Sequence, residues 1–201
     1  MPKKRNSNWT WAFVKNGNAN VGRIQYASST KQEYNAFKTK ANLTRGVPRF
    51  GQRQKNYLAA QGGGIRKTYV SASLRRRMPR AKRADLAAVG VLNPAHNPPG
   101  GGHKSHLVPD IFGGPSSALN LVNEMKPINL SGHKRIENRI DRMIKAVTAP
   151  GDTHPTTKRG GLVMRENYNQ QGRPTQRTYM VSVKDRVNNT RGYHKLTFTR
   201  L

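Results

Sequence analysis

The chain has 201 residues and combines 37 Lys and Arg with 9 Asp and Glu, a formal net charge of +28 at pH 7. So large a positive charge exceeds what solubility requires and indicates a polyanionic partner. Because the chain has no cysteine, disulfides, thiol nucleophiles and cysteine-ligated zinc are excluded. In addition, no apolar run is typical of a membrane span or a conventional signal peptide.

The N-terminal residues predict a β-hairpin. Trp9, Trp11 and Phe13 alternate with Thr10 and Ala12, which is typical of a short strand with one aromatic face. Residues 21–26 can pair back against it through a turn at Asn16-Gly17. We expect the aromatic face to be packed core, although a base-stacking platform is the alternative among so many lysines.

A weakly periodic segment, 32–43, then predicts a helix. A dense cationic stretch follows and is the expected nucleic-acid-binding surface: it contains Arg75, Arg76, Arg77, Arg80, Lys82 and Arg83. Residues 1–89 hold 20 basic and 2 acidic residues, net +18, against 17 and 7, net +10, in residues 90–201. We therefore expect residues 1–89 to be a basic nucleic-acid-binding or loading region, ordered or not. Residues 93–102, rich in Pro and Gly, are expected to form a loop before the next element.

Eight polar residues fall within the 35-residue window from 103 to 137: His103, Lys104, Ser105, His106, Asp110, Asn120, Asn129 and Glu137. The β-branched and aromatic run 107–112 predicts a strand or strand-loop element headed by His106. Ser131 is the predicted N-cap of a helix that Pro150-Gly151 ends.

That helix has one apolar stripe, formed by Ile136, Ile140, Met143, Ile144 and Val147. His133 and Glu137 are four residues apart on another face, where we expect His133 to be a helix-surface residue. Farther on, residues 161–167, 177–184 and 195–200 have β character, with a turn at Asn188-Asn189. His96, His154 and His194 are expected to be loop histidines.

The window holds the residue types that single-metal phosphodiester hydrolysis needs. A base must take a proton from water, and a divalent ion must neutralise charge at phosphorus and on the departing oxygen. Because magnesium prefers oxygen ligands and retains waters, the Asn129 amide oxygen with water-mediated support from Glu137 forms a suitable shell. His106 is preferred as base over His103, which follows three glycines and is expected to be exposed.

These residues resemble the DNA/RNA non-specific endonucleases of the His-Me finger, or ββα-metal, superfamily, in the compact form of bacterial toxin domains. The resemblance rests on Ser105-His106-Leu107, Asp110, Phe112-Gly113-Gly114, Asn120-Leu121-Val122, Asn129 and His133-Lys134-x-x-Glu137-Asn138. It implies that His106 is the general base, that Asn129 is the direct ligand of Mg²⁺ (or Mn²⁺), and that Glu137 holds the water shell of the metal. Asn120 would orient the histidine or brace the loop.

The chain departs from this family at two positions. Longer members have Asp-Arg-Gly-His where this chain has His103-Lys104-Ser105-His106, so Lys104 or an arginine elsewhere must replace the arginine that stabilises the transition state. Asn123 replaces the usual proline after Asn-Leu-Val. Lys134 and Arg135, beside Glu137, are further expected phosphate contacts.

Together these features predict an α+β protein: a ββα-metal nuclease core of antiparallel strands and one catalytic helix in residues 90–201, preceded by a basic extension. The expected activity is magnesium-dependent endonucleolytic hydrolysis of DNA, with RNA as a second substrate. The resemblance implies a 5′-phosphate product and an effector or toxin exported by a specialised route, with an acidic immunity protein or carrier as partner; otherwise the protein would be cytoplasmic. The rival class is a non-catalytic ribosomal or architectural protein, which would have the same charge.

Overall fold

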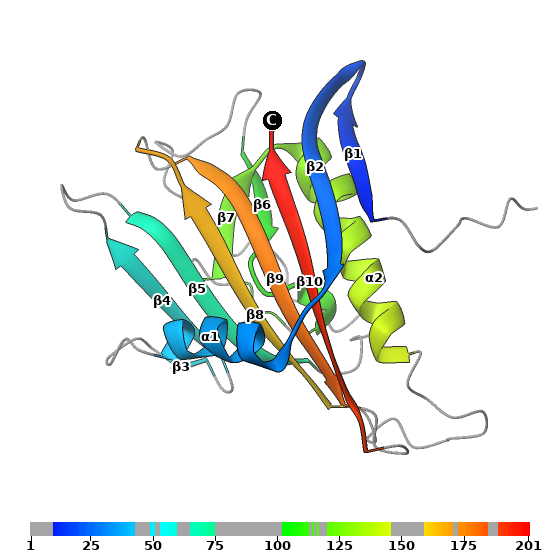
Figure 1. Ribbon diagram of the computed structural model, residues 1–201. Coiled ribbons are helices and arrows are strands. Elements are labelled where there is room, and N and C mark those ends of the chain that lie inside the picture. The colour runs from blue at the N-terminus through cyan, green and yellow to red at the C-terminus, as the bar shows by residue number, and fades with distance from the viewer. Residues whose placement is uncertain are drawn as a thin grey trace, which may run out of the picture.

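The computed structural model shows an α+β protein dominated by antiparallel strands (Figure 1). It describes residues 10–42, 49–50, 53–59, 65–74, 102–112, 114, 116, 120–145, 159–170, 173–184 and 189–201. Within them, one sheet has the order β1-β2-β10-β9-β8-β5-β4-β3 and a second has the order β6-β7.

The strands of the large sheet are β1 (Trp11–Asn16), β2 (Ala19–Ser28), β3 (Arg49–Phe50), β4 (Arg53–Ala59), β5 (Ile65–Leu74), β8 (Arg159–Tyr168), β9 (Pro174–Lys184) and β10 (Arg191–Arg200). The small sheet comprises β6 (His103–His106) and β7 (Leu121–Glu124). The helical elements are α1 (Lys31–Asn42), α2 (Lys134–Lys145), the 3-10 turn η3 (Asp110–Phe112) and the π-helical turn η5 (Ile128–His133).

The expected N-terminal hairpin is confirmed. β1 and β2 pair antiparallel, and Gly17 in the turn has φ +58°, a conformation that glycine adopts without steric cost. The aromatic face of the hairpin was expected to be packed core, but it is not buried: Trp11 is 58% and Phe13 39% exposed. The hairpin contributes Val14 and Ile24 to the core instead, from the face that packs toward α2.

Strands from both ends of the chain share the large sheet. β2 pairs with β10 along seven residues, and β5 pairs with β8 along eight. The central strands β8, β9 and β10 are therefore flanked on both sides by strands that precede residue 90. The division into 1–89 and 90–201 stays a prediction about which part binds and which part cuts.

The two faces of the large sheet carry different elements (Figure 1). The expected helix α1 lies on one face, over a cluster of Tyr34, Tyr69, Val163 and Met180. α2 and the β6–β7 pair lie on the other face, above the main core. The apolar stripe of α2 is confirmed there, since Ile136 and Ile140 are fully buried.

The helix begins earlier than expected. Helical backbone is already present at Pro127, whose φ of −62° suits a helix start, and Ser131 lies inside η5 rather than capping α2. The described part of α2 ends at Lys145, so Val147 and the expected stop at Pro150-Gly151 lie outside the described residues.

The expected strand at 107–112 is wrong in position. β6 ends at His106, and residues 107–112 form a bend followed by η3. The cause is local: Pro109 has no backbone N–H, and the backbone N–H and C=O of Val108 are engaged by the Asn120 side chain instead of a strand. His106 is therefore the last residue of a strand, not the first.

Candidate functional site

Asn120 fixes the backbone immediately after His106. Its Oδ1 accepts a hydrogen bond from Val108 N at 2.9 Å, and its Nδ2 donates to Val108 O at 3.0 Å. Its backbone oxygen also accepts from Leu107 N at 2.8 Å. Gly114 packs so closely here that a Cβ would lie 1.8 Å from Val108 O, which explains the glycine. These contacts with Leu107 and Val108 are the kind expected of a brace of this loop.

Asn129, in η5, lies against the start of β6. Its Nδ2 donates to the backbone oxygen of Lys104 at 3.1 Å and is 2.5 Å from Nδ1 of His103. Both amide hydrogens therefore have acceptors, which leaves Oδ1 as the atom of this side chain able to bind a cation. The histidine in this contact is His103, which sequence reasoning had treated as an exposed residue, although it is partly buried.

Glu137 and the expected phosphate contacts lie on the first turn of α2. The Glu137 carboxylate is 17% exposed and lies 4.0 Å from Nζ of Lys134. Arg135 is exposed and donates to the backbone oxygen of Phe13 in β1 at 3.0 Å. The cationic residues Arg75, Arg76, Arg77, Arg80, Lys82 and Arg83 lie outside the described residues.

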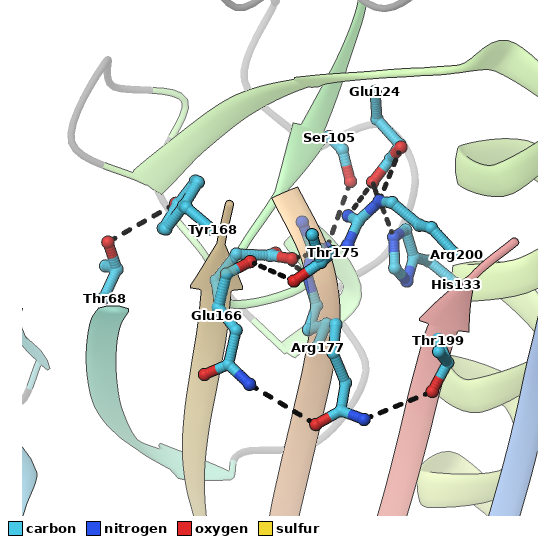
Figure 2. A network of polar contacts seen from close by, with 12 residues as sticks. Thr68, Ser105, Glu124, His133, Glu166, Tyr168, Thr175, Arg177, Thr199 and Arg200 are labelled. Atoms are coloured by element: carbon cyan, nitrogen blue, oxygen red, sulfur yellow. Dashed lines mark hydrogen bonds and ion pairs between the residues drawn. The ribbon is translucent and has the colours of Figure 1, made fainter. Parts of the chain in front are cut away.

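A ring of six buried or nearly buried side chains lies behind this site. Figure 2 shows Glu124, His133, Glu166, Arg177 and Arg200 of this ring. Arg177 donates to Tyr179 Oη at 3.3 Å, Tyr179 Oη lies 3.1 Å from Nδ1 of His133, and His133 Nε2 lies 3.4 Å from Glu124. Arg200 bonds to Glu124 and, at 2.7 Å, to Glu166, and Glu166 closes the ring by accepting from Nε of Arg177. The ring links β7 and η5 to the central strands β8, β9 and β10.

Burial and charge together set the protonation of this ring. Burial lowers the pKa of His133 to about 3, with Arg177 adding to the effect, so the imidazole is neutral. A neutral His133 imidazole fits the geometry, because its Nε2 donates to the Glu124 carboxylate while its Nδ1 accepts from the Tyr179 hydroxyl. Burial would raise the pKa of Glu124, but Arg200 and His133 hold it well below its usual range. Two arginines and two glutamates then leave the ring with no net charge.

Burial also raises the pKa of Tyr179 to about 12, so its hydroxyl stays a donor. His133 was expected on the helix surface, and that expectation is wrong: its side chain is 1% exposed, packed against Phe198 with ring centroids 5.1 Å apart. His194, expected in a loop, lies in β10 and contacts Tyr26 Oη at 3.0 Å. His96 and His154 lie outside the described residues.

Arg177 extends the ring to β6. Its Nη1 donates at 3.2 Å to Ser105 Oγ (Figure 2) and, also at 3.2 Å, to the backbone oxygen of His106. Sequence reasoning missed Arg177, Glu166, Arg200 and Glu124, and only their charge in otherwise strand-like segments could have drawn attention to them.

In the part of the chain that the structure describes, no group of three or more His, Cys, Asp or Glu side chains is arranged to hold a metal. A cation at Asn129 would therefore depend on the amide oxygen, water and substrate oxygens, which is a coordination that magnesium tolerates. None of the helices in the described ranges has the length and apolar character of a membrane span.

Comparison with known proteins gives one family. Residues 52–150 match the family model described as DNA/RNA non-specific endonuclease, and this segment includes β6, β7, η5 and α2 with His106, Asn120, Asn129 and Glu137. No curated protein and no solved structure matches the chain. Endonucleases of this family generally use a divalent metal. The match therefore identifies residues 52–150 as a segment of the DNA/RNA non-specific endonuclease family, and this segment makes the protein a hydrolytic nuclease.

Proposed function

We propose that this nuclease is a magnesium-dependent endonuclease of the ββα-metal type, which cuts DNA and also accepts RNA. The observation that carries the proposal is the orientation of Asn129. Both hydrogens of its amide are used by β6, so its oxygen is free to take a hard cation beside the strand that ends in His106. The order of β6, β7 and then η5 with α2 supports a ββα unit.

The proposed reaction divides the work among four side chains. His106 takes the proton of the attacking water as the new P–O bond forms. The bond to the 3′ oxygen breaks and that oxygen takes a proton from solvent water, which leaves a 5′-phosphate and a 3′-hydroxyl. When bound, Mg²⁺ would supply neutralisation of the negative charge that develops on the reacting phosphate and on the leaving oxygen. Asn129 would hold that ion directly and Glu137 would orient its waters, while Lys104 would bind a phosphate oxygen.

Basic residues supply substrate affinity in this proposal. Lys134 is 40% exposed beside Glu137, and the cluster from Arg75 to Arg83 carries six further positive charges. Contacts of this kind add affinity without sequence preference and weaken with salt. We propose in addition that the protein is an exported toxin or effector, with an acidic immunity protein or carrier as partner, for which its net charge of +28 is the support.

The test is cleavage of supercoiled plasmid and of RNA with Mg²⁺, with Mn²⁺ and with excess chelator. We expect nicked and linear DNA only with metal, and a loss of roughly two to four orders of magnitude in His106→Ala with nearly unchanged DNA affinity. His194→Ala is the matched control, because it removes a half-buried histidine of β10 outside the site. Full activity in His106→Ala with loss in His103→Ala would assign the base to His103.

The metal assignment has its own measurement. Asn129→Ala should abolish saturable magnesium activation, and Glu137→Ala should shift activation to higher magnesium concentration, because the first removes a ligand and the second an organiser of its waters. Isothermal titration of Mg²⁺ into the uncut complex with a non-hydrolysable DNA duplex gives the same information without turnover. Unchanged titrations in both variants would contradict the site.

A further inference from the structure

Charged side chains of β9 and β10 contact the β6–β7 pair, in addition to the Asn129 amide of η5. Its backbone hydrogen bonds in the described residues join β6 to β7, and the two form a sheet separate from the large one. Arg177 reaches β6 and Arg200 reaches β7 through Glu124, while His133 connects η5 to the same ring. Side chains of β9 and β10 therefore hold β6, β7 and η5, which are three elements of the candidate site. β9 and β10 themselves lie outside the segment 52–150 that matches the nuclease family.

Stability alone is a weak explanation for this ring. Removing ions from water is costly, and replacing a buried ion pair with apolar side chains of similar volume is often neutral or stabilising. Moreover, the chain has only 9 acidic residues against 37 basic ones. Two of these acidic residues, Glu124 and Glu166, are buried inside the protein, at 2% and 0% exposure. A geometric role accounts for their position better than an energetic one.

Of the six side chains in the ring, Arg177 is the one that contacts β6, the strand that ends in His106. It is fully buried, so it cannot reach substrate, and its contact with the site is through Ser105 Oγ and the His106 carbonyl, each at 3.2 Å. The His106 carbonyl is one residue before the point where Leu107 and Val108 are fastened by Asn120. His106 is therefore held from two sides, by Arg177 at its own carbonyl and by Asn120 just after it.

We propose that Arg177, oriented by Glu166, is a positioning residue that sets the place of the His106 imidazole through the β6 backbone. The inference rests on the proposed role of His106 as the base. A misplacement of about 1 Å at a reacting group can cost on the order of a hundredfold in rate. Loss of the contact between Arg177 and β6 should therefore lower kcat. The affinity for nucleic acid should not change, because it depends on surface cations.

The principal variant is Arg177→Met with Glu166→Gln. It removes one positive and one negative charge, so Arg200 and Glu124 still balance and no buried ion is left alone. The assay uses a fluorescent DNA duplex and Mg²⁺ at a temperature well below the melting temperature of the variant protein. Relative to the parent, we expect kcat to fall about tenfold to a hundredfold and KM to stay within about twofold. Tyr168→Phe is the matched control, because it removes a contact with Thr68 on the same side of the sheet without touching β6.

Coupling to His106 separates positioning from general weakening. If Arg177 acts through His106, the double substitution should cost nothing further in the His106→Ala background, because the group it positions is gone. An equal loss in both backgrounds would overturn the proposal, as would a kcat within about threefold of the parent. Full activity of His106→Ala itself would instead refute the proposed function, so the two failures are distinguishable.

Arg177→Lys covers the case in which the double variant does not fold. It keeps the charge opposite Glu166, but one ammonium group cannot bond Glu166 and both β6 acceptors in the planar geometry of a guanidinium. We expect the same fall in kcat at unchanged KM, again absent in His106→Ala, and a parent-like kcat would overturn the proposal.

Discussion

The neutral His133 inside the ring predicts how stability depends on pH. Its ordinary pKa is 6.5, and burial lowers the value in the folded protein to about 3. Between these values the unfolded chain binds one more proton than the folded protein at this residue. Stability is therefore fully present above pH 6.5 and is lost as pH falls, with a slope of about 1.4 kcal/mol per pH unit from this group.

The window from pH 6.5 to 4.5 isolates His133 from Glu124. The pKa of Glu124 is lowered by its partners from an ordinary 4.5, so its contribution is lost only below that pH. Over these two pH units the cost of keeping His133 neutral amounts to about 3 kcal/mol. His133→Gln should remove this dependence, because an uncharged amide can still donate to Glu124 and accept from Tyr179.

The assay is urea unfolding followed by circular dichroism at pH 4.5, 5.5, 6.5 and 7.5. The free energy of unfolding of the parent minus that of His133→Gln should decline by about 3 kcal/mol from pH 6.5 to 4.5, while all other groups cancel in the difference. A difference that stays constant within about 0.5 kcal/mol would show that His133 takes up its proton in the same pH range in the folded protein as in the unfolded chain, and the lowered pKa would be refuted.

Three further outcomes are expected. Asn120→Ala should cost about 2–4 kcal/mol in urea unfolding, because the buried N–H and C=O of Val108 lose their partners, and a cost below about 0.5 kcal/mol would show that the brace is dispensable. Gly22→Ala should cost about 1–3 kcal/mol in the same assay, since its Cβ would lie 2.2 Å from Phe198 Cζ; an unchanged midpoint would mean that the ring yields freely. A chain lacking residues 1–89 should show no cooperative melt by circular dichroism, because β10 loses β2 and β8 loses β5, whereas a cooperative melt would support an appended binding arm.

Local signals predicted local structure well. Alternating residues and Asn16-Gly17 predicted the first hairpin, the isoleucine spacing predicted the buried face of α2, and the β character of 161–167, 177–184 and 195–200 matches β8, β9 and β10. The end of β6 was misplaced because the group that replaces a strand partner of Val108 is the side chain of Asn120, twelve residues later in the sequence.

Long-range arrangement was beyond the sequence pattern. His133 has the spacing of a surface helical residue, and only Tyr179 and Phe198, far along the chain, make it a core residue. Arg177 likewise sits in a strand with no local sign that a carboxylate from β8 neutralises it. Burial of a charge depends on partners that adjacent residues do not reveal, so the ring could not be predicted from one sequence.

The topology of the large sheet has a consequence for synthesis on the ribosome. The outer strands β1–β5 are translated before the strands that they flank, β8, β9 and β10. Until residues 159–200 emerge, β2 and β5 have no central partner, and β6 has no Arg177 to hold it. A ribosome-bound chain therefore carries every residue of the candidate site before it has the strands that arrange them, so assembly of the nuclease must wait until β8, β9 and β10 have been made.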